Sequence, residues 1–173
     1  MSRLATAVLA ALIIGGTAAA LAVAEPWPAT FSGEAMAVDG DTLRLGAARI
    51  RLHGIDAPES HQPCFVHGQA PAAVSSTYDC GAMATAALAS MLTRGSRVTC
   101  QAKANDPHGR TVATCSNSGG DLGARMVARG WAVDWPKYSG GAYSDHEAAA
   151  RAWGLGIWGG SFFLPKSRKG NHK

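Results

Sequence analysis

Five short segments with the residue pattern of strands, and a helical segment after the third, limit the folds open to this sequence more than any other feature. The strand segments are residues 30–38, 42–45, 49–53, 97–102 and 111–115. Within 49–53, polar and apolar residues alternate, so one face is cationic and the other can enter a core. The order of three strands, a helix and two strands predicts an α+β fold, built on a five-stranded barrel of the oligonucleotide/oligosaccharide-binding (OB) type.

Three helices are expected beside this barrel. The first spans Gly81–Thr93, with apolar residues spaced as on one helix face. The second starts near Asp121, whose charge suits a helix start, and stops at Gly130. The third starts at Ser144-Asp145-His146-Glu147, which has the pattern of a capping box, and ends near Gly154. The long stretch before the first helix and the short one after Trp135 are expected to be mostly loop.

The chain opens on an apolar segment. Residues 4–24 follow a short basic head, and Ala22-Val23-Ala24 resembles a cleavage site. We therefore expect residues 1–24 to be a secretory signal peptide and 25–31 a linker, so that the protein is exported to the periplasm or secreted. An uncleaved membrane anchor is the alternative, because the apolar run is just long enough to span a bilayer.

The four cysteines fit an exported protein, since an even number suggests disulfides. Cys100 and Cys115 lie almost symmetrically about the turn at Asp106–Gly109, so they would face each other across a hairpin. That pairing leaves Cys64 with Cys80, a bond that would pin the long loop before the first helix. Zinc binding is the alternative, but no C-x-x-C or H-x-x-x-H pair supports it.

Three carboxylates are expected to converge on one rim of the barrel. Asp41 opens the second strand, and Asp56 and Glu59 come just after the third. Because these two strands form a hairpin, the start of one lies beside the end of the other. Carboxylates gathered in this way repel one another, and a hard cation bound through oxygen atoms would compensate them.

Two arginines are expected near the same rim, Arg51 on the third strand and Arg110 at the head of the fifth. Their planar guanidinium groups suit a phosphate, which accepts paired hydrogen bonds. A metal ion, a carboxylate and two arginines can together promote the attack of water on a phosphodiester. Plain structural explanations also exist: Asp39-Gly40 can be a turn, Arg51 a solvated strand residue and Arg110 a partner of Asp106.

In order and spacing, four motifs resemble the thermonuclease (staphylococcal nuclease) family. They are Val38–Leu43, Ile50–Glu59, Asp106–Arg110 and the closing Glu147…Ala150-Arg151…Gly156-Ile157-Trp158. The resemblance covers residues 32–160 and leaves 161–173 as a basic tail. It implies an OB barrel with three helices and a calcium-dependent phosphodiesterase that acts on DNA and RNA.

By position, the resemblance also implies a role for each site residue. Asp41 and Asp56 would bind Ca²⁺ through their carboxylates, and Ala57 would bind it through its backbone carbonyl. Arg51 and Arg110 would hold the scissile phosphate. Glu59 would act on the attacking water.

The chain departs from the family pattern at three positions. Ala57 stands where the best-studied member has threonine, which a carbonyl ligand does not need. Pro107 and His108 replace a lysine and a tyrosine near the substrate phosphate, so His108 is the substrate-binding position where affinity and pH dependence are expected to differ. The cysteines fit an exported branch of the family.

Two other functions remain as alternatives. One is a family member that binds nucleic acid without cutting it, and the other is an envelope-associated OB module that binds oligosaccharide. The net charge of +4 is compatible with a polyanionic partner such as DNA or RNA but fits many exported proteins too. We expect a monomer.

Overall fold

The structure, a computed structural model, describes residues 29–66, 77–95 and 97–163. The expected signal peptide, most of the expected linker, the middle of the expected loop and most of the basic tail lie outside these residues. Among the described residues, no helix is long and apolar enough to cross a membrane.

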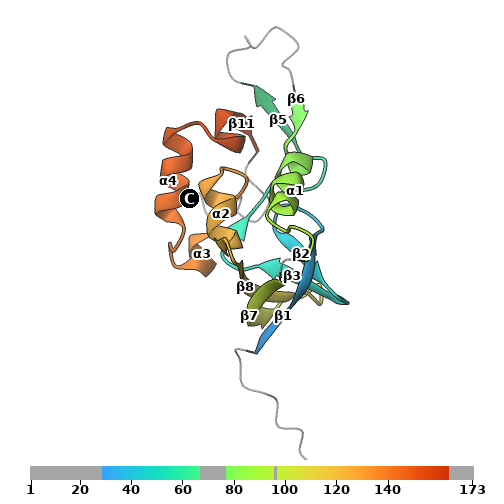
Figure 1. Cartoon of the computed structure of the whole chain (residues 1–173). Helices are drawn as coiled ribbons and strands as arrows, with labels where there is room; N and C mark the ends of the chain where they lie inside the picture. Colours follow the sequence, from blue (N-terminus) through green and yellow to red (C-terminus); the bar gives the residue numbers. More distant parts are fainter. Residues whose placement is uncertain (1–28, 67–76, 96, 164–173) are drawn as a thin grey trace, which may run out of the picture.

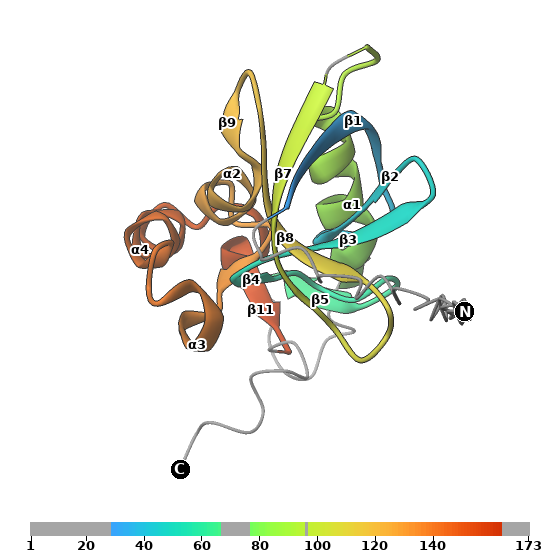
Figure 2. The same cartoon turned by 90° about the horizontal axis from the view of Figure 1, so that it is seen from below.

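Five strands close a barrel, as the sequence predicts (Figures 1 and 2). In sequence order they are β1 (Thr30–Ala37), β2 (Thr42–Leu45), β3 (Ala48–Leu52), β7 (Arg97–Asn105) and β8 (Thr111–Asn117). Strands β1, β2 and β3 form an antiparallel meander, and β7 pairs with both β1 and β8. A parallel pairing of β3 with β8 closes the barrel. This is the strand order of an OB fold.

Inward-facing side chains of the barrel strands fill the interior. Leu43, Ile50 and Val98 are fully buried there. Helix α1 (Cys80–Ser90) packs against β1 and adds Leu88 to the same core. The burial of these side chains stabilises the barrel through removal of apolar surface from water.

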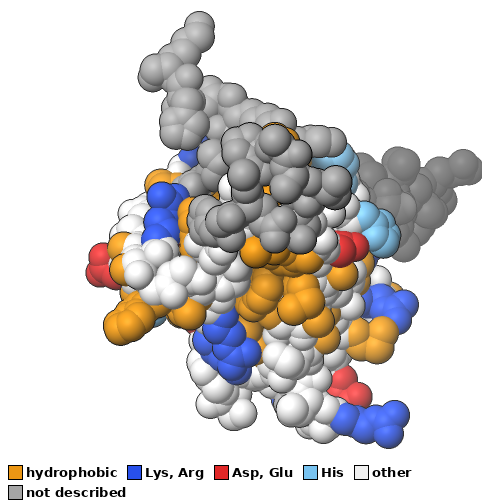
Figure 3. Space-filling model, turned by 90° about the horizontal axis from the view of Figure 1, so that it is seen from above, with side chains coloured by type: hydrophobic (Ala, Val, Ile, Leu, Met, Phe, Trp, Pro, Cys, Tyr) orange, Lys and Arg blue, Asp and Glu red, His pale blue; other side chains and the backbone are white. Residues whose placement is uncertain are grey.

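The remaining elements gather beside the barrel and at one end of it. Helices α2 (Leu122–Ala128), α3 (Pro136–Ser139) and α4 (Ser144–Ala152) lie on one side in both views (Figures 1 and 2). The short strands and the 3₁₀ helix are β4 (Ile55–Asp56), β5 (Pro63–Val66), β6 (Thr77–Asp79), β9 (Gly120–Asp121), β10 (Val133–Asp134), η1 (Gly156–Gly159) and β11 (Gly160–Phe162). Strand β4 pairs with β10, and β5 pairs with β6 and β11. Apolar side chains gather on the face seen from above in Figure 3.

Residues 54–78, expected to be mostly loop, include β4, β5 and most of β6, and residues 67–76 of this range lie outside the described part. Two other local predictions are wrong. The expected loop after Trp135 begins with the one-turn helix α3. The predicted capping box at Ser144 does not form, because Tyr143 is the N-cap and its side chain makes no capping hydrogen bond. Glu147 instead accepts a hydrogen bond from the backbone N–H of Asp134, so a tertiary contact takes the carboxylate that the motif assigned to the cap.

Both predicted disulfides are present. Cys100 and Cys115 are direct partners in the register of β7 and β8, with their Cα atoms 4.1 Å apart. Cys64 on β5 is bonded to Cys80, the first residue of α1, with a Cα separation of 5.6 Å. The two bonds therefore support an oxidising, exported environment for the protein.

We expect the double variant Cys100→Ala/Cys115→Ala to lose about 3 kcal/mol of unfolding free energy, since the bond closes a loop of about 15 residues in the unfolded chain. Urea denaturation followed by circular dichroism measures this loss. The parent protein, measured with and without reductant, is the control. A change within about 0.5 kcal/mol, the range of ordinary surface substitutions, would contradict the prediction.

Candidate functional site

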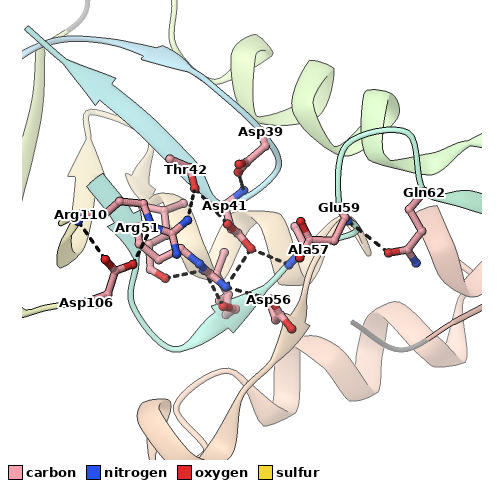
Figure 4. A network of polar contacts seen from close by, with 12 residues as sticks. Asp39, Asp41, Thr42, Arg51, Asp56, Ala57, Glu59, Gln62, Asp106 and Arg110 are labelled. Carbon is pink, nitrogen blue, oxygen red and sulfur yellow. Dashed lines mark hydrogen bonds and ion pairs between the residues drawn. The ribbon is translucent and has the colours of Figure 1, made fainter. Parts of the chain in front are cut away.

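The carboxylates and arginines singled out in the sequence line one pocket at the barrel rim (Figure 4). Its volume is about 200 Å³, and it is lined by Asp39, Asp41, Arg51, Asp56, Ala57, Pro58, Glu59, Arg110 and Trp135. The predicted convergence of Asp41, Asp56 and Glu59 therefore occurs in the folded chain. It comes from the β2–β3 hairpin, in which Thr42 faces Arg51 across the strands.

A tight turn before β2 holds Asp41 at the rim. The Asp39 carboxylate accepts a hydrogen bond from the Asp41 backbone N–H at 3.0 Å, and Val38 donates to the Thr42 carbonyl at 2.8 Å. Gly40 is required here because a Cβ at this position would lie 2.6 Å from Ala57 Cβ and 2.8 Å from Ala84 Cβ. Asp39-Gly40 is thus the turn that the sequence suggests, and Asp41 faces the pocket.

The guanidinium of Arg51 lies between the two buried aspartates. Its Nη2 is 3.0 Å from Asp41 Oδ2 and 2.8 Å from Asp56 Oδ1. Its Nη1 donates to the backbone carbonyls of Leu52 at 3.0 Å and Ile55 at 2.9 Å. Arg51 is therefore no solvated strand residue, because it neutralises two carboxylates and fixes the turn between β3 and β4.

Asp41 has an unusual affinity for protons. Burial, helped by the nearby charges of Asp39 and Asp56, raises the pKa of Asp41 to about 7 even though the charge of Arg51 opposes the shift. Its oxygens accept hydrogen bonds from the Ala57 backbone N–H at 2.9 Å and from the Thr42 hydroxyl at 3.3 Å. A carboxylate with this surplus of negative potential is suited to a cation.

Glu59 lies at the exposed edge of the pocket. Among the described residues, none donates a hydrogen bond to its carboxylate. Its backbone is held firmly, since Glu59 N–H donates to the Gln62 side-chain carbonyl at 3.2 Å and Gln62 N–H donates to the Glu59 carbonyl at 2.9 Å. Cys80 N–H in turn donates to the Gln62 carbonyl at 3.1 Å, so the turn is tied to the start of α1.

Asp106 positions Arg110, which agrees with the predicted pairing of these two residues. Its Nε lies 2.6 Å from Asp106 Oδ2, and its Nη1 lies 3.4 Å from the Thr42 hydroxyl. Asp106 also accepts hydrogen bonds from the backbone N–H groups of His108 and Arg110, which closes the turn between β7 and β8. The pair with Asp106 orients Arg110 towards the pocket and does not exclude it from the site.

The residues expected to bind calcium form an all-oxygen set. Two carboxylates, those of Asp41 and Asp56, approach one guanidinium nitrogen within 3.0 Å, so they are close enough for one cation to contact both. Four carboxylates and two guanidinium groups line the pocket, an excess of negative charge. Among the described residues, no group of three or more His, Cys, Asp or Glu has the arrangement of metal ligands. A hard cation at these two carboxylates would need further oxygen ligands, from the backbone or from water.

A second pocket of about 380 Å³ adjoins the first and shares Arg51, Arg110 and Trp135 with it. His108, the expected substrate-binding residue, lines this second pocket. The second pocket is also lined by His53, Lys103 and Tyr138, which were not predicted as site residues from the sequence. Trp135 makes an edge-to-face contact with Tyr138 at 4.5 Å between ring centroids. Burial, and then the charge of Lys103, lowers the pKa of His53.

The chain matches the sequence model of a known family and is similar to a named protein. Residues 49–160 match the sequence model of the family described as "Staphylococcal nuclease homologue". The chain is also 34% identical over 153 residues to the "Succinoglycan biosynthesis protein ExoI" of Rhizobium meliloti (strain 1021), across 88% of this chain and 73% of that protein.

We expect Arg51→Met to lower the unfolding free energy by about 3–5 kcal/mol, because it leaves two buried carboxylates without their shared cation. Arg110→Met is the matched control. It removes a more exposed pair with Asp106, so its cost should be about 1 kcal/mol or less. Urea denaturation in the presence of a chelator measures both, and equal losses in the two variants would refute the central role of Arg51.

The raised pKa of Asp41 predicts a pH dependence of stability. Between the ordinary value of 3.8 and about 7, the folded protein binds a proton at Asp41 that the unfolded chain releases. Stability should therefore fall as the pH rises through this range, by up to about 1.4 kcal/mol per pH unit from this group. Asp41→Asn should lose that contribution. Unfolding free energies measured in chelator from about pH 4 to about pH 8 test this, and parallel curves for the two proteins would disprove it.

Proposed function

The chain belongs to the staphylococcal nuclease homologue family, and on that premise we propose that it is a calcium-dependent nuclease that hydrolyses phosphodiester bonds of DNA or RNA. The observation that carries this proposal is the rim pocket itself. It gathers two arginines, two buried aspartates and an exposed glutamate around one cavity. This set matches the chemical needs of phosphodiester hydrolysis: charge neutralisation, phosphate binding and activation of water.

Arg110 would be the principal donor to the scissile phosphate. Of the five N–H groups of an arginine side chain, Asp106 and Thr42 each take one, and no other described residue accepts from the rest. The remaining donors can therefore form paired hydrogen bonds to phosphate oxygens. These bonds would strengthen as negative charge builds up in the transition state.

Arg51 would act from the other side of the pocket. Its Nη1 and Nη2 atoms already donate to two carbonyls and approach two carboxylates, so Nε–H is the donor that it can offer without rearrangement. Ca²⁺ held by Asp41, Asp56 and the Ala57 carbonyl would neutralise the site and stabilise charge on the phosphate. Arg51 would also keep the two aspartates aligned for that purpose.

Glu59 would accept the proton of the attacking water. Its carboxylate borders the pocket, lies in solvent and has no competing donor among the described residues. The hydrogen bonds between the Glu59 backbone and Gln62 would fix the position from which it acts. General base catalysis of this kind contributes about 10²–10⁴ to the rate.

The second pocket would take the nucleoside next to the scissile phosphate. Trp135 and Tyr138 supply aromatic surface for a sugar or base, and Lys103 supplies a cation for a neighbouring phosphate. His108 lies in the same pocket, where it would replace part of the contact that other family members make with a tyrosine.

A role in polysaccharide synthesis is the second candidate, because the relative from Rhizobium meliloti is named for succinoglycan biosynthesis. In that case the barrel would bind an oligosaccharide. The pocket residues favour the nuclease, since a neutral sugar needs neither the paired arginines nor the excess of carboxylates. A member that binds nucleic acid without cutting it is the third candidate. Under each candidate we propose a monomer, exported to the periplasm or secreted and either cleaved after residue 24 or retained by residues 4–24.

We expect the purified protein to cut single-stranded DNA with calcium and to lose this activity in EGTA. Arg110→Ala should lower kcat about 10²–10³-fold, and Glu59→Gln should lower it about 10²–10⁴-fold. Gel assays of fluorescent oligonucleotides measure the rates. Arg129→Ala and Asp145→Asn, which remove exposed charges just after α2 and on α4, are the matched controls.

Each alternative has its own outcome in the same experiment. Binding of DNA in a gel shift without cleavage would indicate a non-catalytic member. Cleavage that Arg110→Ala leaves unchanged would exclude the rim pocket as the active site. An absence of both binding and cleavage, together with binding of an oligosaccharide, would favour the polysaccharide role.

A further inference from the structure

Two more arginines continue the outer face of the β2–β3 hairpin beyond the pocket. Arg44 and Arg49 are direct partners in the antiparallel register, two pairs along from Thr42 and Arg51. Side chains that face each other across two strands, or that lie two residues apart on one strand, point to the same side of a sheet. Arg44, Arg49 and Arg51 therefore share one face, and the first two are exposed.

The stability of the barrel does not explain this pair of cations. Like charges directly opposite each other destabilise a sheet. Among the described residues, neither Arg44 nor Arg49 forms an ion pair, and the one hydrogen bond of Arg44 is a weak contact of 4.0 Å with the sulfur of Met36. A binding partner that carries negative charge would relieve the repulsion.

Apolar surface borders the two arginines. Met36 on β1 is the register partner of Arg44 and is 55% exposed, and Val38, two residues further along, is 41% exposed. The combination of cations with apolar side chains beside them suits single-stranded nucleic acid, whose phosphates and bases need different contacts. A duplex would hide its bases from such a surface.

We propose that Arg44 and Arg49 bind the phosphates on one side of the scissile one in a single-stranded substrate, with its bases against Met36 and Val38. This proposal rests on the proposed nuclease function. The row that Arg44 and Arg49 share lies about 6.6–6.8 Å along the strand from the row of Arg51, close to the spacing of successive phosphates in an extended strand. Arg44 and Arg49 thus form a short cationic track on this face. Glu34, two residues before Met36 on β1, limits the track to these two arginines.

The double variant Arg44→Gln/Arg49→Gln tests the proposal by binding alone. In a Glu59→Gln background, fluorescence anisotropy with a labelled twelve-nucleotide strand gives the dissociation constant at several salt concentrations. Each lost phosphate contact should reduce the slope of log affinity against log salt by about 0.7, so the double variant should reduce it by about 1.4. Arg97→Gln/Arg129→Gln is the control. It removes the same charge, but Arg97 faces Glu34 on β1 and Arg129 lies at the end of α2.

Cleavage gives a second, independent measurement. The double variant should lower kcat/KM about tenfold on the long strand and much less on a dinucleotide, which has no flanking phosphate. The double variant should also be at least as stable as the parent protein, since it removes a like-charge pair. A loss of binding or cleavage that came from misfolding would appear as a loss of stability, so it is distinguishable from a loss of phosphate contacts.

Two results would overturn the proposal: a salt slope equal to that of the control variant, or an equal loss on the long strand and the dinucleotide. Failure of the proposed function is distinguishable from both. If the parent protein cuts no substrate but the double variant still loses salt-dependent binding, the nuclease function fails and the track remains supported as a binding surface. If the parent protein cuts DNA and the slope is unchanged, the track alone is wrong.

Discussion

The rim of this barrel depends on the contact between Arg51 and two buried aspartates. Asp41 and Asp56 are 7% and 5% exposed, and carboxylates at such depth are costly unless they are paired. One guanidinium satisfies both, while its other nitrogen binds the carbonyls on either side of the turn between β3 and β4. Gly54 permits that turn, with a φ of +78° and no room for a Cβ against Ser139. A single side chain thereby ties β2, β3 and β4 into one site.

The sequence was sufficient where local geometry decides position. A hairpin brings the start of one strand to the end of the next, so Asp41, Asp56 and Glu59 could be placed on one rim, and a turn between two cysteines could pair Cys100 with Cys115. The sequence was insufficient where contacts between distant segments determine the local structure. The register of β7 shifts between Ala102 and Ala104, so the strand continues past its expected end and places Lys103 in the second pocket. The wrong capping box has a similar cause, because Glu147 is buried against β10 and paired with Arg151.

The position of Glu59 depends on contacts from distant parts of the chain. Gln62 holds the Glu59 backbone with its side-chain oxygen and donates to the Phe163 carbonyl with its side-chain nitrogen at 2.8 Å. The same turn rests on the first turn of α1, where a Cβ on Gly81 would overlap the Glu59 carbonyl. The Cys64–Cys80 bond joins the two segments covalently. In a domain with a small core, such a crosslink can fix a loop that few apolar contacts support.

The distribution of charge would divide the two proposed tasks between neighbouring surfaces: cation binding in the pocket and strand binding beside it. The pocket contains more carboxylates than arginines, so by itself it repels a polyanion, whereas Arg44 and Arg49 on the adjoining face attract one. With Asp41 ionised, the excess in the pocket, four carboxylates against two guanidinium groups, equals the charge that one divalent cation would cancel. A phosphate could then enter between Arg51 and Arg110 without facing a net negative field. If both ligands bind as proposed, electrostatics alone would couple them: the cation would lower the free energy of the bound phosphate, and by linkage the phosphate would raise the affinity for the cation.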